Sequence, residues 1–541
     1  MRIKVYVALL GRYKVPLMLA VAVAIGFSAM YSQTNAFATL AGDQGNDDAY
    51  ISFRYSQNLV EGHGLVYNPG EQAVEGYSNF LYTLMIAGGI AIAGTDWTYQ
   101  YALLINLTFG LMLLILISRS RHLTMTAKVG AIILTGITPA VAYWAASGLE
   151  TVPVVAVQVG IVLLTEEIVR MGTRWKTLGG LTILCAVSIF LRADGFLIPL
   201  LSTLYLGLRR YQPAIVVGIG TVCAMAGQFG WRLWYYGDLM PNTYYAKVSG
   251  SLGERLTSAQ GVMSVIWWQT GIYLAITILA SATLWQLWHK KGQFWNVPFR
   301  YWFFTAWLVY WPYVGGDIYL ERFLVTLFPL AWITLCQAIR WVLKGNTPLR
   351  RQAQTCLIAG MLTIVVVTPR WITYEQQAGL NSTGWAFLGE ILKREGPNET
   401  LAIDAAGKAP FVSGLRTIDM FGLNDLHIGR MPVEEGKFVL GHAKMDMDYV
   451  LNQKPRFIAS WAGMDSVFGD SINLDTMKIM NLPYTTYKEQ GYELYKLVNP
   501  NKTKSMPPPA TASEWQIALM SGCNYAVLRR QDEHVALAAN H

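Results

Sequence analysis

Charged residues are scarce in this 541-residue chain: Lys, Arg, Asp and Glu make up only 14% of it, whereas hydrophobic residues make up 53%. An average soluble domain carries roughly 25% charged residues. With so little charge and a mean hydropathy of +0.31, the chain cannot cover its surface with water-compatible side chains. The composition therefore excludes a soluble globular protein and a disordered one, and it indicates a protein that is largely solvated by lipid.

Cysteines and common catalytic motifs are also rare. Of the five cysteines, only Cys523 lies outside the apolar runs, and no spacing is typical of a disulfide framework or a zinc site. The sequence has no P-loop, no HExxH, no GxSxG and no dinucleotide-binding fingerprint. The signatures of nucleotide-dependent, metalloprotease and serine-hydrolase sites are therefore missing.

Long apolar stretches dominate the first two thirds of the chain. A spanning helix needs about 20 largely apolar residues. Eleven candidates lie at residues 15–31, 100–118, 127–146, 152–168, 177–191, 195–208, 213–231, 262–286, 300–314, 323–341 and 354–368. A further stretch, 79–94, is shorter and rich in glycine, and we expect a juxtamembrane or half-inserted helix there.

The distribution of positive charge predicts the orientation of these spans. Lys and Arg concentrate in the loops 1–14, 119–128, 170–176, 209–210, 290–300 and 340–351, whereas the loop 33–99 has Arg54 as its single basic residue. Since Lys and Arg accumulate on the cytoplasmic side, the N-terminus is predicted inside and the C-terminus outside. The net charge of +8 then belongs to the inner loops, while the outer face is acidic, which argues against a nucleic-acid partner.

Three regions follow from these patterns. Residues 1–368 form the transmembrane domain, in which 33–99 is the first outer loop with its juxtamembrane helices. Residues 369–500 alternate short strand-like runs with helical stretches and predict an extracytoplasmic α/β domain. Residues 501–541, with three consecutive prolines, are interpreted as a linker or loosely attached tail.

The first outer loop is dense in hydrogen-bonding and aromatic residues. Asp47 and Asp48 are adjacent carboxylates close to the end of the first span. They are either solvated acids or a helix N-cap, or they belong to a site. The surrounding side chains suit the binding of a sugar through hydroxyl hydrogen bonds and ring stacking. They are Tyr50, Arg54, His63, Glu75, Tyr77 and Asn79; His63 stands between glycines and is more often a turn residue than a metal ligand.

Further polar residues lie at the outer ends of the spans, where each needs a hydrogen-bond or ion-pair partner or has a functional role. They are Glu150, Arg192, Asp194, Asn242, Tyr244, Lys247, Asp317 and Arg322. Arg192 with Asp194, and Asp317 with Arg322, are either structural ion pairs or parts of a site. Lys247 either snorkels to lipid headgroups or binds a phosphate.

Carboxylates and cations on one lipid-adjacent face suit a lipid-phosphate-linked donor. The phosphate leaving group needs positive charge, which Lys247, Arg192 or Arg322 would supply. The acceptor hydroxyl needs a carboxylate base, or the anomeric carbon a carboxylate nucleophile, and Asp47 or Asp48 would supply either. One carboxylate acting as base predicts inversion at the anomeric carbon, and a nucleophile predicts retention.

The run DDAYISFRYSQNLVEGHGLVYNPGEQAVEGYSNFL, residues 47–81, resembles the first periplasmic loop of membrane-embedded GT-C glycosyltransferases, specifically those similar to the terminal arabinofuranosyltransferase of the mycobacterial cell wall. The resemblance continues through SGLET, LRADG, YYGDLMPNTYYAK, GGDIYLERF, DAAGKAPFVSGLRTIDMFGLND and GHAKMDMDYVLNQKPRFI. It implies a GT-C fold, a polyprenyl-phosphate arabinofuranose donor, and a catalytic acid at Asp47 or Asp48. It also implies a location in the bacterial inner membrane, with a cell-surface glycan, a pilin or another protein as acceptor.

The sequence thus predicts a polytopic α-helical membrane glycosyltransferase with a C-terminal extracytoplasmic α/β domain. One alternative is a GT-C enzyme with a hexose or aminoarabinose donor that acts on lipid A or protein. Another is a lipid or sugar transporter or flippase, although a transporter would place its charges near mid-span. No cofactor is predicted: a divalent cation is compatible with the many acidic residues, but no ligand spacing supports one.

Overall fold

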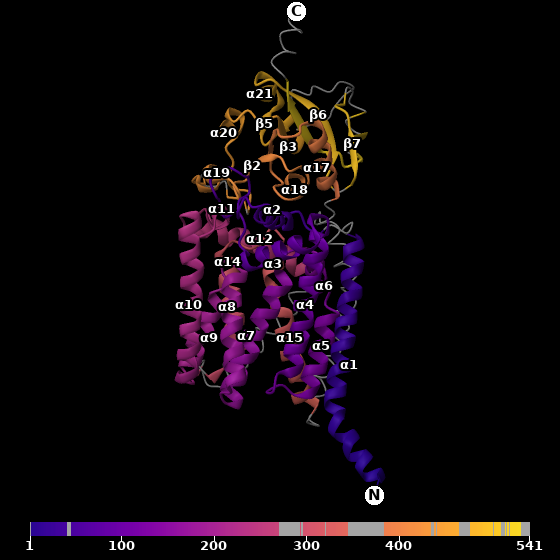
Figure 1. The fold of residues 1–541 in the computed structure, drawn as a ribbon, viewed down its shortest axis with the longest axis vertical. Helices are drawn as coiled ribbons and strands as arrows, with labels where there is room; N and C mark the ends of the chain where they lie inside the picture. The colour runs from indigo at the N-terminus through magenta and orange to yellow at the C-terminus, as the bar shows by residue number, and fades with distance from the viewer. Residues whose placement is uncertain are drawn as a thin grey trace, which may run out of the picture.

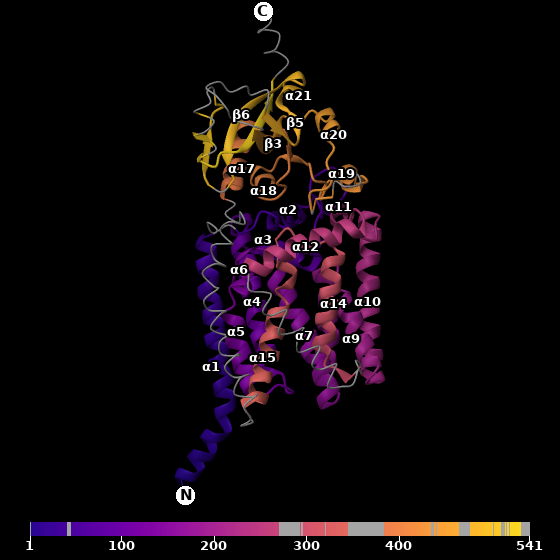
Figure 2. The same ribbon diagram turned by 180° about the vertical axis from the view of Figure 1, so that it is seen from behind.

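The computed structural model describes residues 2–40, 45–269, 293, 296–319, 321–343, 383–433, 438–439, 441–464, 477–500, 502–509, 514, 517–518 and 520–531. Long helices run side by side in a bundle, and an α/β domain covers one end of it (Figure 1). The view from behind shows the same two layers, with α12, α14 and α15 nearer the viewer (Figure 2).

The bundle is built from helices whose sequences are apolar over most of their length. Its members are α1 (Arg2–Leu40), α3 (Phe80–Ala93), α4 (Thr98–Arg119), α5 (Met125–Gly136), α6 (Pro139–Ala146), α7 (Thr151–Met171), α8 (Trp175–Leu191), α9 (Leu197–Gly207), α10 (Tyr211–Tyr236), α14 (Phe299–Tyr313) and α15 (Leu327–Leu343). Short 3₁₀ turns, η1 (Thr95–Trp97) and η3 (Arg322–Leu324), precede α4 and α15.

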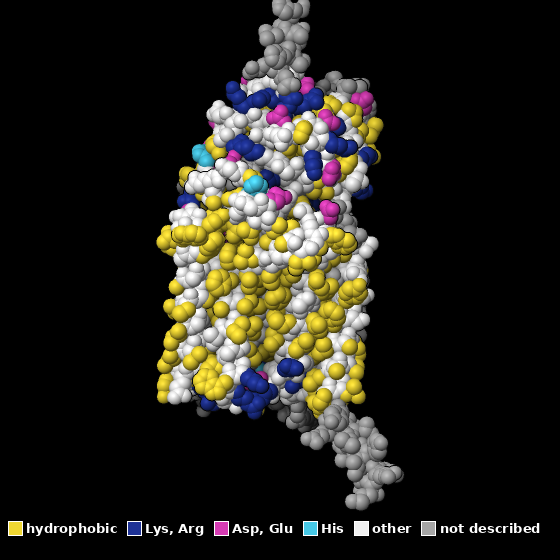
Figure 3. Space-filling view, in the orientation of Figure 1, with side chains coloured by type: hydrophobic (Ala, Val, Ile, Leu, Met, Phe, Trp, Pro, Cys, Tyr) yellow, Lys and Arg dark blue, Asp and Glu magenta, His cyan; other side chains and the backbone are white. Residues whose placement is uncertain are grey.

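Length and hydropathy identify a membrane domain. Among the described residues, four helices are long and apolar enough to cross a bilayer, namely those at Val15–Thr39, Thr95–Arg119, Thr151–Met171 and Tyr211–Tyr236. α5 and α6 together make a fifth candidate, bent by 52° at a break before Pro139, which starts α6 where its missing N–H costs least. A broad hydrophobic belt covers the face of the bundle seen in Figure 3, with Lys and Arg at its lower end.

Helices occur at nine of the eleven expected spans. Residues 354–368 lie outside the described residues, as does most of 262–286, so the number eleven stays a prediction. Within the stretch 79–94, residues Phe80–Ala93 form α3, which Figures 1 and 2 place at the end of the bundle next to the α/β domain.

Small residues allow the helices to approach closely. At the crossing of α1 and α5, a Cβ added to Gly136 would lie 2.3 Å from the carbonyl oxygen of Gly26. Small residues are typical of helix interfaces in membranes because packing drives association there. α7 lies at the centre, packed against α4, α8, α9 and α14, and is buried on almost every face. This packing fixes both ends of α7, and Glu150 precedes its first residue.

The α/β domain contains one mixed sheet with the strand order β2-β1-β3-β8-β6-β7. β1 pairs in parallel with β2 and β3, and the other pairs along this path are antiparallel. The strands are β1 (Thr400–Ile403), β2 (Arg416–Asp419), β3 (Phe457–Met464), β4 (Met477–Ile479), β5 (Leu482–Pro483), β6 (Tyr492–Asn499), β7 (Lys504–Met506) and β8 (Tyr525–Arg530). The helices are α17 (Thr383–Glu395), α18 (Lys408–Ser413), α19 (Leu426–Arg430), α20 (Met447–Asn452) and α21 (Tyr484–Glu489).

The sheet corrects the interpretation of residues 501–541 as a linker or tail. β7 lies at one edge of the sheet, and β8 lies inside it between β3 and β6. Tyr525 and Leu528 of β8 are completely buried, because they belong to the cores on the two sides of the sheet. The described strands of this segment, β7 and β8, are therefore an integral part of the α/β domain.

Three helices lie where the bundle meets the α/β domain: α2 (Ala49–Val60), α11 (Asn242–Lys247) and α12 (Leu252–Gln269). α2 packs against α3 on one side and α18 on the other. Tyr55, Tyr67 and Tyr77 of the first loop form a small apolar core that includes Ala406 of the α/β domain. The first outer loop is thus held between the two parts of the protein.

Candidate functional site

Asp47 and Asp48 occupy different environments just before α2. The Asp47 carboxylate accepts hydrogen bonds from the backbone N–H groups of Gly407 (3.2 Å) and Lys408 (2.8 Å) at the start of α18. Burial raises the pKa of the Asp47 carboxyl, and the two backbone N–H groups oppose that rise. Asp47 therefore anchors the α/β domain to the first loop.

Asp48 makes no such contact. Its side chain does not cap α2, and within the described parts of the chain its carboxylate has no hydrogen bond or ion pair. Its backbone N–H donates to Asn46 Oδ1 at 2.9 Å, which fixes the backbone while the half-buried side chain remains unengaged. Of the two predicted acids, Asp48 is the one available to a ligand.

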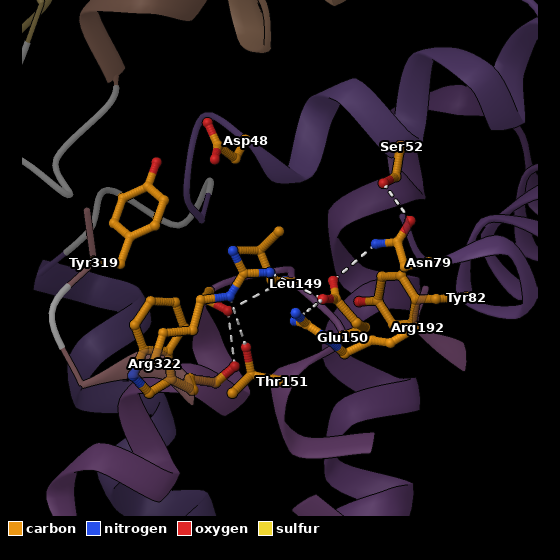
Figure 4. A network of polar contacts seen from close by, with 12 residues as sticks. Asp48, Ser52, Asn79, Tyr82, Leu149, Glu150, Thr151, Arg192, Tyr319 and Arg322 are labelled. Carbon is orange, nitrogen blue, oxygen red and sulfur yellow. Dashed lines mark hydrogen bonds and ion pairs between the residues drawn. The ribbon is translucent and has the colours of Figure 1, made fainter. Parts of the chain in front are cut away.

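Glu150 is the centre of a buried polar network below Asp48 (Figure 4). Its Oε1 accepts from Arg192 at 3.1 Å and from Arg322 at 2.9 Å. Its Oε2 accepts from Asn79 Nδ2 at 2.8 Å, and Asn79 Oδ1 accepts from Ser52 of α2 at 2.9 Å. One carboxylate thus joins both arginines to the first outer loop.

The same network extends toward α14. Arg192 Nε donates to Asp194 Oδ1 at 2.9 Å, and the Tyr310 hydroxyl donates to Asp194 Oδ2 at 2.9 Å. Arg322 Nε also contacts Thr151 Oγ1 at 3.3 Å. Two arginines are held in place by two acids, so the positions of both guanidinium groups are fixed before any ligand arrives.

A cavity of about 920 Å³ lies beside this network. At its polar end it is lined by all three cations that the sequence assigned to a phosphate, together with three other predicted site residues: Arg192, Lys247, Arg322, Asp194, Tyr244 and Asp317. Tyr310 also lines this end. Lys247, at the end of α11, has no hydrogen bond or ion pair within the described residues. It is therefore a cation available to a ligand.

The other end of the cavity is apolar and is formed mainly by α9 and α14. Leu197, Leu200, Leu201 and Leu204 of α9 line it. Leu204 is 56% exposed and Val309, on α14, is 67% exposed, although both lie in apolar helices of the bundle. The apolar end of the cavity is therefore built partly from side chains that are exposed on the outside of the bundle.

The segment after α14 connects the cavity to Asp48. Asp317, Ile318, Arg322 and Phe323 line the cavity. The Tyr319 side chain stands next to Asp48, and both lie above Glu150 in the view of Figure 4. Burial raises the pKa of Tyr319 well above its usual value, and the charge of Asp48 adds to this effect. Asp48 does not itself line the cavity, but it acts on Tyr319, which stands between the lining residues Ile318 and Arg322 in the sequence.

Several predicted sugar-binding residues lie elsewhere and hold the two domains together. Arg54 donates to the carbonyl oxygens of Tyr67, Pro410 and Leu415 at 2.6–2.7 Å, and to Asn68 Oδ1 at 3.0 Å. Asn242 Nδ2 lies within 3.1 Å of three carbonyl oxygens of the α/β domain, those of Gly422, Leu423 and Asp425. Because their donors are already occupied, Arg54 and Asn242 have a docking role in this geometry.

The remaining loop residues also contact protein groups. Glu75 forms a buried ion pair with Arg232 of α10 (2.9 Å). Tyr77 bonds to the Tyr236 hydroxyl at 3.0 Å. Tyr50 is buried, with its ring near the Lys408 ammonium, and His63 is exposed at a turn. None of these four predicted residues lines the 920 Å³ cavity.

Tyr310, Tyr319 and Lys408 belong to the site or its support, although sequence reasoning did not single them out. Tyr310 and Tyr319 lie in an aromatic-rich stretch where composition does not separate a ligand-facing ring from a packed one. Lys408 Nζ donates to the carbonyl oxygen of Gly45, and it stands in the run DAAGK that carried the family resemblance. That run and GGDIYLERF, which contains Tyr319, were the available signals. No group of three or more His, Cys, Asp or Glu side chains placed to hold a metal ion occurs among the residues that the structure describes.

Comparisons with known proteins give limited similarity. Residues 370–518 match a family described as "Domain of unknown function (DUF8728)". No curated protein matches the chain. Among solved structures, it is similar to ArnT from Cupriavidus metallidurans bound to undecaprenyl phosphate, at 14% identity over 83% of this chain and 93% of that one, with a TM-score of 0.45. It is also similar to the Archaeoglobus fulgidus oligosaccharyltransferase in complex with Zn and sulfate, at 11% identity over 74% of this chain and 62% of that one, with a TM-score of 0.42.

Proposed function

We propose that this chain is a membrane glycosyltransferase of the GT-C type that transfers a sugar from a polyprenyl phosphate to an acceptor hydroxyl. One observation carries the proposal. A single cavity combines an apolar end, built partly from side chains exposed on the outside of the bundle, with a polar end that has three cations, and the unengaged Asp48 carboxylate stands next to Tyr319 of the segment that lines it. A lipid-linked sugar phosphate has the same three parts: an apolar chain, an anion and a reacting sugar.

The apolar part of the cavity suits the polyprenyl chain. Leucines of α9 and side chains of α14 form a wall that a lipid chain reaches from the bilayer without crossing water. The phosphate then lies at the polar end, where Arg192, Arg322 and Lys247 neutralise it. Arg192 and Arg322 are held by Glu150, so they contribute a fixed field, and Lys247 contributes a charge with no competing partner among the described side chains.

Asp48 serves the acceptor side of the reaction. As a base, it takes the proton of the acceptor hydroxyl while the acceptor oxygen bonds to the anomeric carbon. The bond between that carbon and the phosphate oxygen breaks, and polyprenyl phosphate leaves with the bonding electrons. As a nucleophile, Asp48 would instead bond to the anomeric carbon first, so the anomeric configuration of the product separates the two mechanisms.

The identity of the sugar, the acceptor and the side of the membrane rests on the sequence. The resemblance of residues 47–81 supports an arabinofuranose donor and a glycan or protein acceptor of the cell envelope. The basic loops at the end of the bundle opposite the α/β domain support a cytoplasmic position for that end. The site is then periplasmic.

The test is a donor panel. The purified chain, reconstituted in liposomes with an envelope glycan extract as acceptor, is offered polyprenyl phosphates that carry arabinofuranose, aminoarabinose or a hexose. We expect transfer from the arabinofuranose donor and release of polyprenyl phosphate. Transfer from only the aminoarabinose or hexose donor would show that the donor sugar differs from arabinofuranose, while the proposed reaction type would stand. If none of these donors bound and none turned over, the proposal of a lipid-phosphate glycosyltransferase would be wrong.

A further inference from the structure

A second polar cavity lies at the end of the bundle opposite the α/β domain. Its volume is about 330 Å³, and it is lined by His122, Thr124, Arg170, Pro298, Arg300, Tyr301 and Gln337. These residues come from the junction of α4 with α5, the end of α7, the start of α14 and the second half of α15. Four separate segments of the chain therefore converge on one small cavity that the proposed reaction does not use.

A buried ion cluster forms the floor of this cavity. Glu166 Oε1 accepts from the backbone N–H of Arg300 at 3.0 Å and from its Nε at 2.8 Å, and Arg300 Nη2 donates to Glu166 Oε2. His122 Nε2 lies 3.1 Å from Glu166 Oε2. All three side chains are almost completely buried. Arg300 thus engages both oxygens of the Glu166 carboxylate, and His122 lies close to one of them.

The groups left to face the cavity are donors. Arg300 Nη1 donates to Gln337 Oε1 at 3.0 Å, which orients the amide and leaves its NH₂ group for another partner. Arg170 follows Glu166 by one helical turn on α7 and has no ion pair within 4.0 Å and no hydrogen bond among the described residues. Thr124 accepts a bond from Ala127 N–H as an N-cap, so its hydroxyl proton remains to be donated.

Positive charge exceeds negative charge around this cavity. Among the described residues that line it, Arg170 and Arg300 are cations and none is a carboxylate, while Glu166 lies beneath and is engaged by Arg300. The neighbouring Glu167 is turned toward Arg121 instead. The accumulation of Lys and Arg on the cytoplasmic side explains why loops at this end are basic. It does not explain why basic side chains line a cavity together with an amide donor.

We propose that this cavity binds the phosphate group of an anionic ligand, with Arg170 and the Gln337 amide as the principal donors. The phosphate has two sources at this position. It belongs either to a phospholipid headgroup, because basic pockets between membrane helices at this level suit such headgroups, or to a free phosphate compound in the aqueous phase. Figure 3 shows Lys and Arg at this end of the molecule, directly beyond the hydrophobic belt.

Thermal unfolding of the detergent-solubilised full chain tests the proposal. The probes are phosphatidylglycerol, phosphatidylcholine and inorganic phosphate, each at the same ionic strength. We expect phosphatidylglycerol, inorganic phosphate or both to raise the unfolding temperature, whereas phosphatidylcholine does not. Stabilisation by phosphatidylglycerol alone assigns the site to a lipid headgroup, and stabilisation by inorganic phosphate assigns it to a free anion.

Variants separate this cavity from general surface charge. Arg170→Gln removes the available guanidinium, and Gln337→Glu places a carboxylate beside the phosphate. Each is expected to weaken the apparent affinity for the stabilising anion by at least about tenfold. Arg174→Gln removes one exposed charge from the same end without touching the cavity and is the matched control. No stabilisation by either anion, or an equal loss in Arg174→Gln, would overturn the proposal.

Discussion

The negative charge of Glu150 holds both site arginines in position. Glu150 is 1% exposed, and its Oε1 accepts from Arg192 and Arg322 while Oε2 accepts from Asn79. Glu150→Gln keeps the shape of the side chain and removes its charge. Among the described contacts, Arg192 would then keep Asp194 as its partner, and Arg322 would keep only the uncharged Thr151 hydroxyl. Because removing one partner of a buried ion pair costs about 3–5 kcal/mol, we expect a loss of that order in the free energy of unfolding.

The assay is unfolding in mixed micelles of increasing SDS content, followed by tryptophan fluorescence. Glu71→Gln is the matched control, because Glu71 pairs with Arg416 and both side chains are more than a third exposed. An exposed pair contributes about 0–1 kcal/mol. The reasoning predicts a clearly larger loss for Glu150→Gln. Equal losses for the two variants would show that the Glu150 network does not hold the site together.

Three further outcomes follow from the contacts. Arg54→Ala removes two hydrogen bonds between the loop and the α/β domain and two within the loop, so amide hydrogen exchange in α18 should rise at least tenfold, whereas Arg416→Ala should leave it unchanged. Lys247→Gln should raise KM for the lipid-phosphate donor about tenfold; a lower kcat with an unchanged KM would contradict phosphate binding. Burial raises the pKa of Asp419 to about 6, so its folded form holds a proton more tightly than the unfolded chain. The α/β domain should therefore lose about 3 kcal/mol of stability as the pH rises from about 4 to 6, and Asp419→Asn should remove this part of the pH dependence in acid-unfolding titrations.

The apolar helices could be predicted because hydropathy is a local property of about 20 consecutive residues. Strand pairing is not local. β8 lies between β3 and β6, and its partners in β3 are more than 60 residues away in sequence. Three prolines upstream gave residues 501–541 the composition of a linker, while the burial of Tyr525 comes from contacts that no window of the sequence contains.

The candidate site could be predicted only in part, because some of its contacts follow from the order of the spans and others depend on distant segments. Arg192 and Arg322 were expected on one face because both follow from the order of the spans, and they do converge on Glu150. Arg54 and Asn242 have the residue types of a sugar site, but their partners are backbone carbonyl oxygens, which carry no sequence signal. The different environments of Asp47 and Asp48 also depend on a distant segment, the start of α18.

The comparison of Asp48→Asn with Asp47→Asn tests the central claim most directly. Both variants exchange a carboxylate for an amide at adjacent positions, and transfer from a polyprenyl-phosphate sugar is measured for each in liposomes. Asp48→Asn should lower kcat by about 10²–10⁴-fold with the fold intact, because it removes the base or nucleophile. Asp47→Asn should chiefly loosen the α/β domain and retain measurable turnover. Wild-type transfer by Asp48→Asn, with transfer abolished in a folded Asp47→Asn, would contradict the account.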